Sequence, residues 1–144
     1  MEIVDILTGS IVLFLVLGIG VGTLVWAYVG SGSTSVVFPQ PVPLPEATED
    51  DRVDEAIARE FLAGTEAYEA KKYDRAVENF STCIERSGQF AQAYHNRGLA
   101  LANLCRDREA AANLVKAGEC YAEGNNEGGV RQIRQNLETL QARI

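Results

Sequence analysis

The sequence predicts an all-α protein with one N-terminal transmembrane helix, a Pro-rich linker, and an α-solenoid of two helical hairpins plus a C-terminal capping helix. Three observations indicate this fold class. Residues 11–30 form an unbroken apolar run, all four prolines lie within residues 39–45, and the sequence after residue 51 repeats small and apolar residues at a fixed interval. The predicted divisions are a short tail over 1–8, the membrane helix over 9–30, an acidic Pro-rich linker over 31–50 and the helical domain over 51–144.

The apolar run has the length and composition of a membrane span. As a helix, its twenty residues cover about 30 Å, the thickness of the hydrocarbon layer, where a helix satisfies its own backbone hydrogen bonds. Eleven residues from Ile11 to Val25 are Ile, Leu, Val or Phe, and together they favour insertion by about 3 to 7 kcal/mol. A cleaved signal peptide normally begins with a basic segment, whereas Glu2 and Asp5 precede this run. We therefore expect a permanent anchor.

Two features within the run indicate how such a helix would sit in a membrane. Gly18 and Gly22 form a G-x-x-x-G pair, which lets another helix approach closely and is compatible with homodimerisation. Trp26 and Tyr28 fall where an aromatic belt meets the lipid headgroups. All 13 Lys and Arg residues lie at or after Arg52, so we expect the C-terminal domain on the cytoplasmic or stromal side. Three cysteines without a C-x-x-C spacing also suit a reducing compartment.

The linker is predicted to be a semi-rigid spacer that holds the helical domain away from the lipid. Prolines at every second residue from Pro39 to Pro45 fix φ and favour polyproline II. A ligand for an SH3-like or WW-like domain is the alternative interpretation. Six of the negative charges precede Arg52, which leaves 13 basic and 14 acidic residues in the remainder of a chain of net charge −7. This nearly neutral domain has no nucleic-acid footprint.

The C-terminal part repeats small and apolar residues at a fixed interval. A glycine in the middle of a helix costs about 0.5 to 1 kcal/mol relative to alanine, so two glycines at one repeat position indicate a close contact between helices. The pairs that match at this one interval are Gly64 with Gly98, Ala76 with Ala110, Phe80 with Leu114, Ala67 with Leu101, and Cys83 with Ala117.

This pattern resembles the tetratricopeptide repeat, a helix-turn-helix unit with a period of about 34 residues, the interval between these pairs. The chain departs from the motif at Glu60, where a large aromatic is preferred, at Gly88, near where a proline would close the repeat, and at Asp107, which replaces the tyrosine of the first unit. The resemblance implies repeats over about 57–90 and 91–124. Motif residues are Gly64, Tyr73, Ala76 and Phe80 in the first unit, and Tyr94, Gly98, Ala110 and Leu114 in the second.

The periodicity predicts helices near 51–70, 74–87, 90–104, 107–122 and 127–143, with Asp74 and Asp107 as N-caps. The last of these helices leaves the repeat register but keeps an apolar face, as a capping helix does. Solenoids usually need about three units for stability. With only two units and a cap, this domain is expected to lean on a partner or on itself.

No residue pattern indicates catalysis. His95 is the only histidine and has no acidic or cysteine partner at helical spacing, so we expect it to pack or to face a groove. Cys83, Cys105 and Cys120 are interpreted as structural thiols. The G-x-G-x-G at Gly18 to Gly22 lies within the apolar run and is no phosphate loop. We therefore expect no enzyme activity, no catalytic or metal site, and no cofactor.

The resemblance instead implies a concave face, lined by the first helix of each repeat, that binds other proteins. Chaperone-binding members of the family hold a C-terminal carboxylate with Lys, Arg and Asn, of which only Asn96 has a counterpart here. A helix or an extended segment of another protein is the expected ligand. The expected groove residues are Phe61, Thr65, Tyr68, Gln92, His95, Asn96 and Leu99.

The order of anchor, spacer and short repeat domain is similar to that of small membrane-anchored tetratricopeptide proteins of cyanobacteria and plastids, including photosystem I assembly factors of thylakoids. This similarity implies a non-enzymatic adaptor, in a thylakoid or plasma membrane, that binds subunits of a membrane complex and assists its assembly or stability. Two alternatives stay open. One is a stoichiometric accessory subunit of such a complex, and the other is a receptor for import or chaperone clients.

Overall fold

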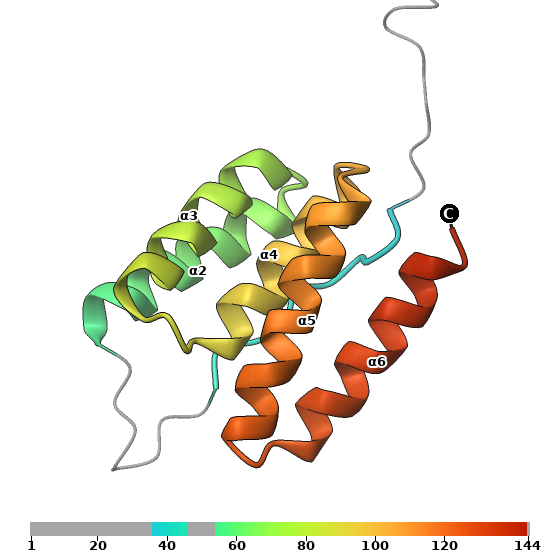
Figure 1. Ribbon diagram of the computed structural model, residues 1–144. Coiled ribbons are helices and arrows are strands. Elements are labelled where there is room, and N and C mark those ends of the chain that lie inside the picture. Colours follow the sequence, from blue (N-terminus) through green and yellow to red (C-terminus); the bar gives the residue numbers. More distant parts are fainter. Residues whose placement is uncertain (1–35, 46–53, 144) are drawn as a thin grey trace, which may run out of the picture. The chain divides into compact units, whose positions relative to one another are not determined.

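The computed structural model describes residues 36–45 and 54–143, in which helices are joined by short turns (Figure 1). These residues contain no strand, which confirms the all-α class for this part of the chain. Most helix ends lie within two residues of the predicted ranges, and α2 begins at Glu55 rather than at 51. The helices are α2 (Glu55–Glu69), α3 (Tyr73–Arg86), α4 (Ala91–Asn103), α5 (Asp107–Glu123) and α6 (Glu127–Gln141).

Among the described residues, no helix has both the length and the hydropathy that a membrane crossing requires. The predicted span over 9–30 lies outside the described residues, and so do Gly18, Gly22, Trp26 and Tyr28.

Helices α2 and α3 pack as one hairpin and α4 and α5 as a second, and α3 also contacts α4. Three of the four turns that join the described helices share one backbone geometry, because Lys71, Cys105 and Asn125 have positive φ values of 59°, 60° and 54°. After each of these residues, a backbone N–H closes a Schellman motif on the preceding helix. The bonds run from Lys72 to the carbonyl of Ala67 (2.8 Å), from Arg106 to Leu101 (2.9 Å) and from Asn126 to Tyr121 (2.8 Å).

The two glycines at the repeated position lie where two helices nearly touch. A Cβ atom added to Gly64 would stand 2.7 Å from Cε1 of Phe80, and one added to Gly98 would stand 3.0 Å from Cγ of Leu114. The second pair follows the first by one repeat period, so the same contact recurs in the two hairpins. This is the close approach that the glycines were expected to permit.

The predicted N-caps are wrong. The helices begin at Tyr73 and at Asp107, so their N-caps are Lys72 and Arg106, and neither cap makes a side-chain hydrogen bond. Asp74 therefore lies within the first turn of α3, where a carboxylate still favours the positive end of the helix dipole. Asp107 pairs with Arg143, which follows α6.

Helix α6 covers α5 and completes the core (Figure 1). Its N-cap Asn126 accepts a hydrogen bond from the backbone N–H of Gly129 at 2.8 Å. Ile133 and Leu140 are buried in the core, and Arg143 donates to the carbonyl of Ala102 at the end of α4 at 2.9 Å. Helix α6 thus packs on α5 through its apolar face.

The described part of the linker does not stand free of the helices. Residues 36–45, which we call the strap, pack against the core with Phe38 only 8% exposed and with Val37, Val42 and Leu44 partly buried. The strap contains no helix or strand, and Figure 1 draws it in cyan, passing behind α4 and α5 in that view. The spacer expected over 31–50 therefore includes ten residues that belong to the folded domain.

Candidate functional site

The strap is held mainly by the side chain of Asn103, at the end of α4. Oδ1 of Asn103 accepts hydrogen bonds from the backbone N–H groups of Val37 (3.0 Å) and Phe38 (3.1 Å). Nδ2 of the same amide donates to the carbonyl of Phe38 (2.8 Å) and to the hydroxyl of Tyr68 (2.9 Å). Both lone pairs and both protons of the amide are thereby used, which fixes its orientation.

Tyr68, on α2, completes the contact with the first part of the strap. Its hydroxyl donates to the carbonyl of Phe38 at 2.7 Å, so this one carbonyl accepts from two side chains. Tyr68 is 1% exposed, and its ring packs edge-on against Tyr73 at 5.1 Å between centroids. Burial raises the pKa of the Tyr68 hydroxyl, and the neighbouring Tyr73 raises it further, so the group stays a neutral donor.

A second, separate contact holds the strap through Asn96, in the first half of α4. Its Oδ1 accepts from the backbone N–H of Val42 at 2.6 Å, and its Nδ2 donates to the carbonyl of the same residue at 2.8 Å. One amide therefore pairs with both backbone groups of one strap residue, as a neighbouring β-strand would. We call Tyr68, Asn96 and Asn103 together the docking site.

The docking site recognises backbone rather than charge. Its three side chains are uncharged, and residues 36–45 carry no formal charge. Asn96 is fully buried and Asn103 is 8% exposed, so an unpaired amide here would cost about 1 to 3 kcal/mol. The site is therefore built for a chain segment that presents free N–H and C=O groups.

Two of the seven residues predicted for the groove belong to the docking site. Tyr68 and Asn96 bind the strap directly, and Leu99 is buried on α4 between the two asparagines in sequence. Asn103 was not predicted. A signal for it exists, because residues seven apart on a helix lie on the same face, and Asn96 and Asn103 are the two asparagines of α4.

Among the described residues, the side chains that hydrogen-bond the strap do not include Phe61, Thr65 or Gln92. Phe61 is fully buried and packs against Phe80 (5.4 Å between centroids) and Phe90 (5.2 Å), so it belongs to the core between the helices. The hydroxyl of Thr65 donates to the carbonyl of Phe61 on its own helix at 3.0 Å. Gln92 is half-buried near the start of α4.

His95 is fully buried and joins three helices. Its Nε2 lies 2.7 Å from Nδ2 of Asn136 on α6, and its Nδ1 lies 3.3 Å from the hydroxyl of Tyr121 on α5. Asn136 donates to Nε2, so the ring proton is assigned to Nδ1, which donates to Tyr121. Burial lowers the pKa of His95 to about 4, which keeps the ring neutral. Its role is structural packing, one of the two roles expected.

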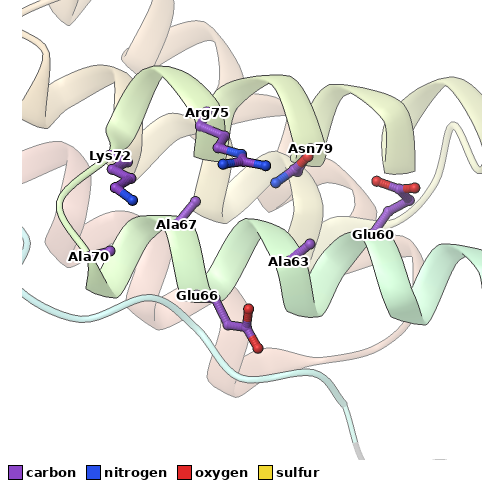
Figure 2. A pocket seen from close by; sticks show the side chains of 8 residues that line it. All are labelled: Glu60, Ala63, Glu66, Ala67, Ala70, Lys72, Arg75 and Asn79. Atoms are coloured by element: carbon purple, nitrogen blue, oxygen red, sulfur yellow. The ribbon is translucent and has the colours of Figure 1, made fainter.

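A second concave feature lies between α2 and α3, apart from the docking site. It encloses about 570 Å³ and has a floor of alanines with charged side chains around it (Figure 2). Ala63 and Ala67 come from α2 and Ala70 directly follows it, and Figure 2 shows Arg75 and Asn79 on the neighbouring α3. Its lining residues are Glu60, Ala63, Glu66, Ala67, Ala70, Lys72, Arg75 and Asn79.

In the described part of the chain, no three His, Cys, Asp or Glu side chains come together as a metal site would require. Cys83 and Cys120 are buried and Cys105 is exposed. Burial, with the nearby negative charge of Glu60, raises the pKa of the Cys83 thiol to about 11, so this thiol stays protonated and unreactive.

In comparisons with known proteins, no protein-family model, no curated protein and no solved structure matches the chain.

Proposed function

We propose that the protein is a non-enzymatic, membrane-anchored adaptor of the tetratricopeptide type, which binds other proteins and assists the assembly or stability of a membrane protein complex. One observation carries the proposal. Asn96 and Asn103 each pair with an N–H and a C=O of a passing chain segment, which is how proteins capture extended peptides.

The repeat geometry supports the tetratricopeptide part of the proposal. The contact of Gly64 with Phe80 recurs at Gly98 and Leu114, and the turn at Lys71 recurs at Cys105, each after one repeat period. That period and a helix-turn-helix unit define this repeat class. The docking site uses the first helix of each hairpin, which is the face expected to bind partners.

The apolar run over 11–30 supports the membrane part of the proposal. Its test is to extract membranes that contain the full chain at alkaline pH. The chain should stay with the lipid, whereas a variant that lacks residues 9–30 should be released. Release of the intact chain would remove the anchor from the proposal. The subunits of a membrane complex, including the photosynthetic complexes of thylakoids, are then the proposed partners.

The adaptor role is tested by cross-linking in native membranes, followed by identification of the attached proteins. The variant Asn96→Leu with Asn103→Leu removes both backbone-pairing amides. Asn79→Leu is the matched control, because Asn79 carries the same amide on α3 and lines the separate concave feature between α2 and α3. We expect the double variant to lose its cross-linked partner and the control to keep it. A partner that survives the double variant would contradict binding through the docking site.

The filled docking site also favours one alternative, a stoichiometric accessory subunit, because such a subunit needs no vacant groove. Purification of the mature complex separates the two functions. An assembly adaptor is left behind, whereas a subunit is retained in a fixed ratio.

A further inference from the structure

We propose that the ligand of the docking site is an uncharged, extended segment of a partner protein in which prolines alternate with other residues, and that the strap is a copy of this ligand held in cis. The partner's segment displaces the strap and takes its place. This inference rests on the proposed function, because it names the ligand class of the same site.

The first step is the match between the prolines and the hydrogen bonds. The strap donates to the docking site from the N–H groups of Val37, Phe38 and Val42. Proline has no N–H, and in this strap the prolines occupy positions from which the site accepts nothing. A ligand must therefore avoid proline at the three donor positions, here Val37, Phe38 and Val42, and can carry it directly after Phe38 and on either side of Val42.

The second step is the spacing, which excludes a helical ligand. Asn96 and Asn103 are seven residues apart on α4, a rise of about 10.5 Å. Their partners Val42 and Phe38 are four residues apart, which cover about 12 Å as polyproline II but only about 6 Å as an α-helix. The docking site therefore binds an extended chain whose two paired residues are four positions apart, and this chain runs antiparallel to α4.

The third step is the register. Phe38 is the one fully anchored side chain of the strap, whereas Gln40, two residues later, is exposed. A shift of the strap by two residues would place Gln40 and Leu44 at the positions of Phe38 and Val42, but it would also place Pro39, which has no N–H, at the position of Val37. The N–H of Val37 and the buried aromatic side chain together select one register. We therefore assign an aromatic residue followed by proline to the start of the ligand and an aliphatic residue four positions later to its end.

The tethered strap competes with any free ligand for the docking site. A short connection raises the effective concentration of a tethered ligand to the millimolar range, so a dilute free segment competes poorly with the strap. The apparent affinity for a free ligand falls in proportion to the small fraction of open sites. A substitution that loosens only the strap should therefore increase binding of the free segment by about 100-fold or more.

The test uses the full chain in lipid nanodiscs and a fluorescent peptide with the sequence of residues 36–45, followed by fluorescence anisotropy. Phe38→Ala in the chain should open the site and increase peptide affinity about 100-fold over the unaltered chain. Adding Asn96→Leu to this variant should abolish the gain. If Phe38→Ala lowers the helical circular dichroism, Val42→Pro in the chain replaces it, because it removes one hydrogen bond and a side chain that is only partly buried.

Two altered peptides provide the matched comparison. Val42→Pro in the peptide removes the N–H that Asn96 accepts, and Gln40→Pro removes an N–H for which the strap has no bond to the docking site. Both keep the polyproline preference. We expect the first to lose binding and the second to bind like the parent peptide. Equal binding of both, or no binding to either opened chain, would overturn the inference.

The outcomes separate this inference from the proposed function. If no peptide binds but membrane cross-links still require Asn96 and Asn103, the cis-copy inference fails and the adaptor stands. If the peptide binds as described but no membrane partner is found, the adaptor fails and the ligand class stands. A dimer of the unaltered chain that Asn96→Leu dissociates would make a second copy the occupant, and would overturn the assignment to a partner protein.

Discussion

The imidazole of His95 should resist protonation until the pH falls well below its usual range, and this resistance should make the fold weaker in acid. Burial lowers the pKa of His95 in the folded protein to about 4, whereas in the unfolded chain it lies near 6.5. Between these values the unfolded state binds a proton that the folded state does not. Stability is therefore complete above about pH 6.5 and decreases as the pH falls toward 4.

The magnitude follows from the size of the shift. The pKa of His95 differs by about 2.5 between the unfolded and the folded state, which corresponds to about 3 kcal/mol of unfolding free energy. Most of this stabilisation is lost at pH 4.5. Acidic side chains also titrate in this window, so the informative quantity is the difference between the native chain and His95→Gln. We expect the native chain to lose about 2 to 3 kcal/mol more than the variant between pH 7.5 and 4.5, measured by urea unfolding of the full chain in neutral detergent.

The sequence contains a single histidine, so its ring signals in NMR are unambiguous. They should report a neutral ring with a proton on Nδ1 at pH 5, as the bond from Asn136 to Nε2 requires. A ring that titrates near pH 6.5 would refute the reasoning, because the buried bridge between α4, α5 and α6 could not then exclude the charged form. Parallel pH profiles of the native chain and the variant would refute it as well.

Three further predictions concern single side chains of the helical domain. Gly64→Val places a Cβ atom about 2.7 Å from the ring of Phe80, so urea unfolding should show a loss of about 1 to 3 kcal/mol in the free energy of unfolding. Gly88→Val is the control and should change this free energy little, because its Cβ meets nothing within 4 Å. Equal effects of the two substitutions would contradict the close helix contact at Gly64. Cys105 should be the one thiol of the native helical domain that a thiol reagent modifies rapidly, and a fast phase that persists in Cys105→Ser would refute this. Asn126→Ala should cost α6 about 1 kcal/mol by hydrogen exchange, with Asn126→Asp as the control that keeps the cap.

The sequence predicts the helices well because their signals are local. The repeat spacing of Gly64 and Gly98 indicates the helix crossings, and the apolar face of the last helix indicates its packing on α5. N-cap positions are less predictable, since a cap depends on backbone angles at one residue. Asp74 and Asp107 are predicted as N-caps because aspartate is a good cap. However, α3 begins one residue before Asp74, and α5 begins at Asp107 itself.

The docking site is only partly predictable, because it depends on contacts between distant residues. Tyr68 and Asn96 follow from the position of the first helices, but Phe61 on the same helix as Tyr68 turns into the core toward Phe80 and Phe90. Alternating prolines favour polyproline II whether the segment is free or bound, so composition alone does not reveal that the strap is docked. The repeat pattern does not indicate that the strap extends the core of this two-unit domain through Phe38.

The docked strap limits how far the helical domain can travel from the proposed anchor, which ends at residue 30. With the strap in place, only residues 31–35 connect the two, and five residues reach at most about 17 Å. With the strap displaced, all residues from 31 to 53 become tether, and their contour length rises to about 75 Å. Binding of a ligand would then also lengthen the tether. A helical domain that has bound its ligand would therefore reach a far larger volume than one whose strap is docked.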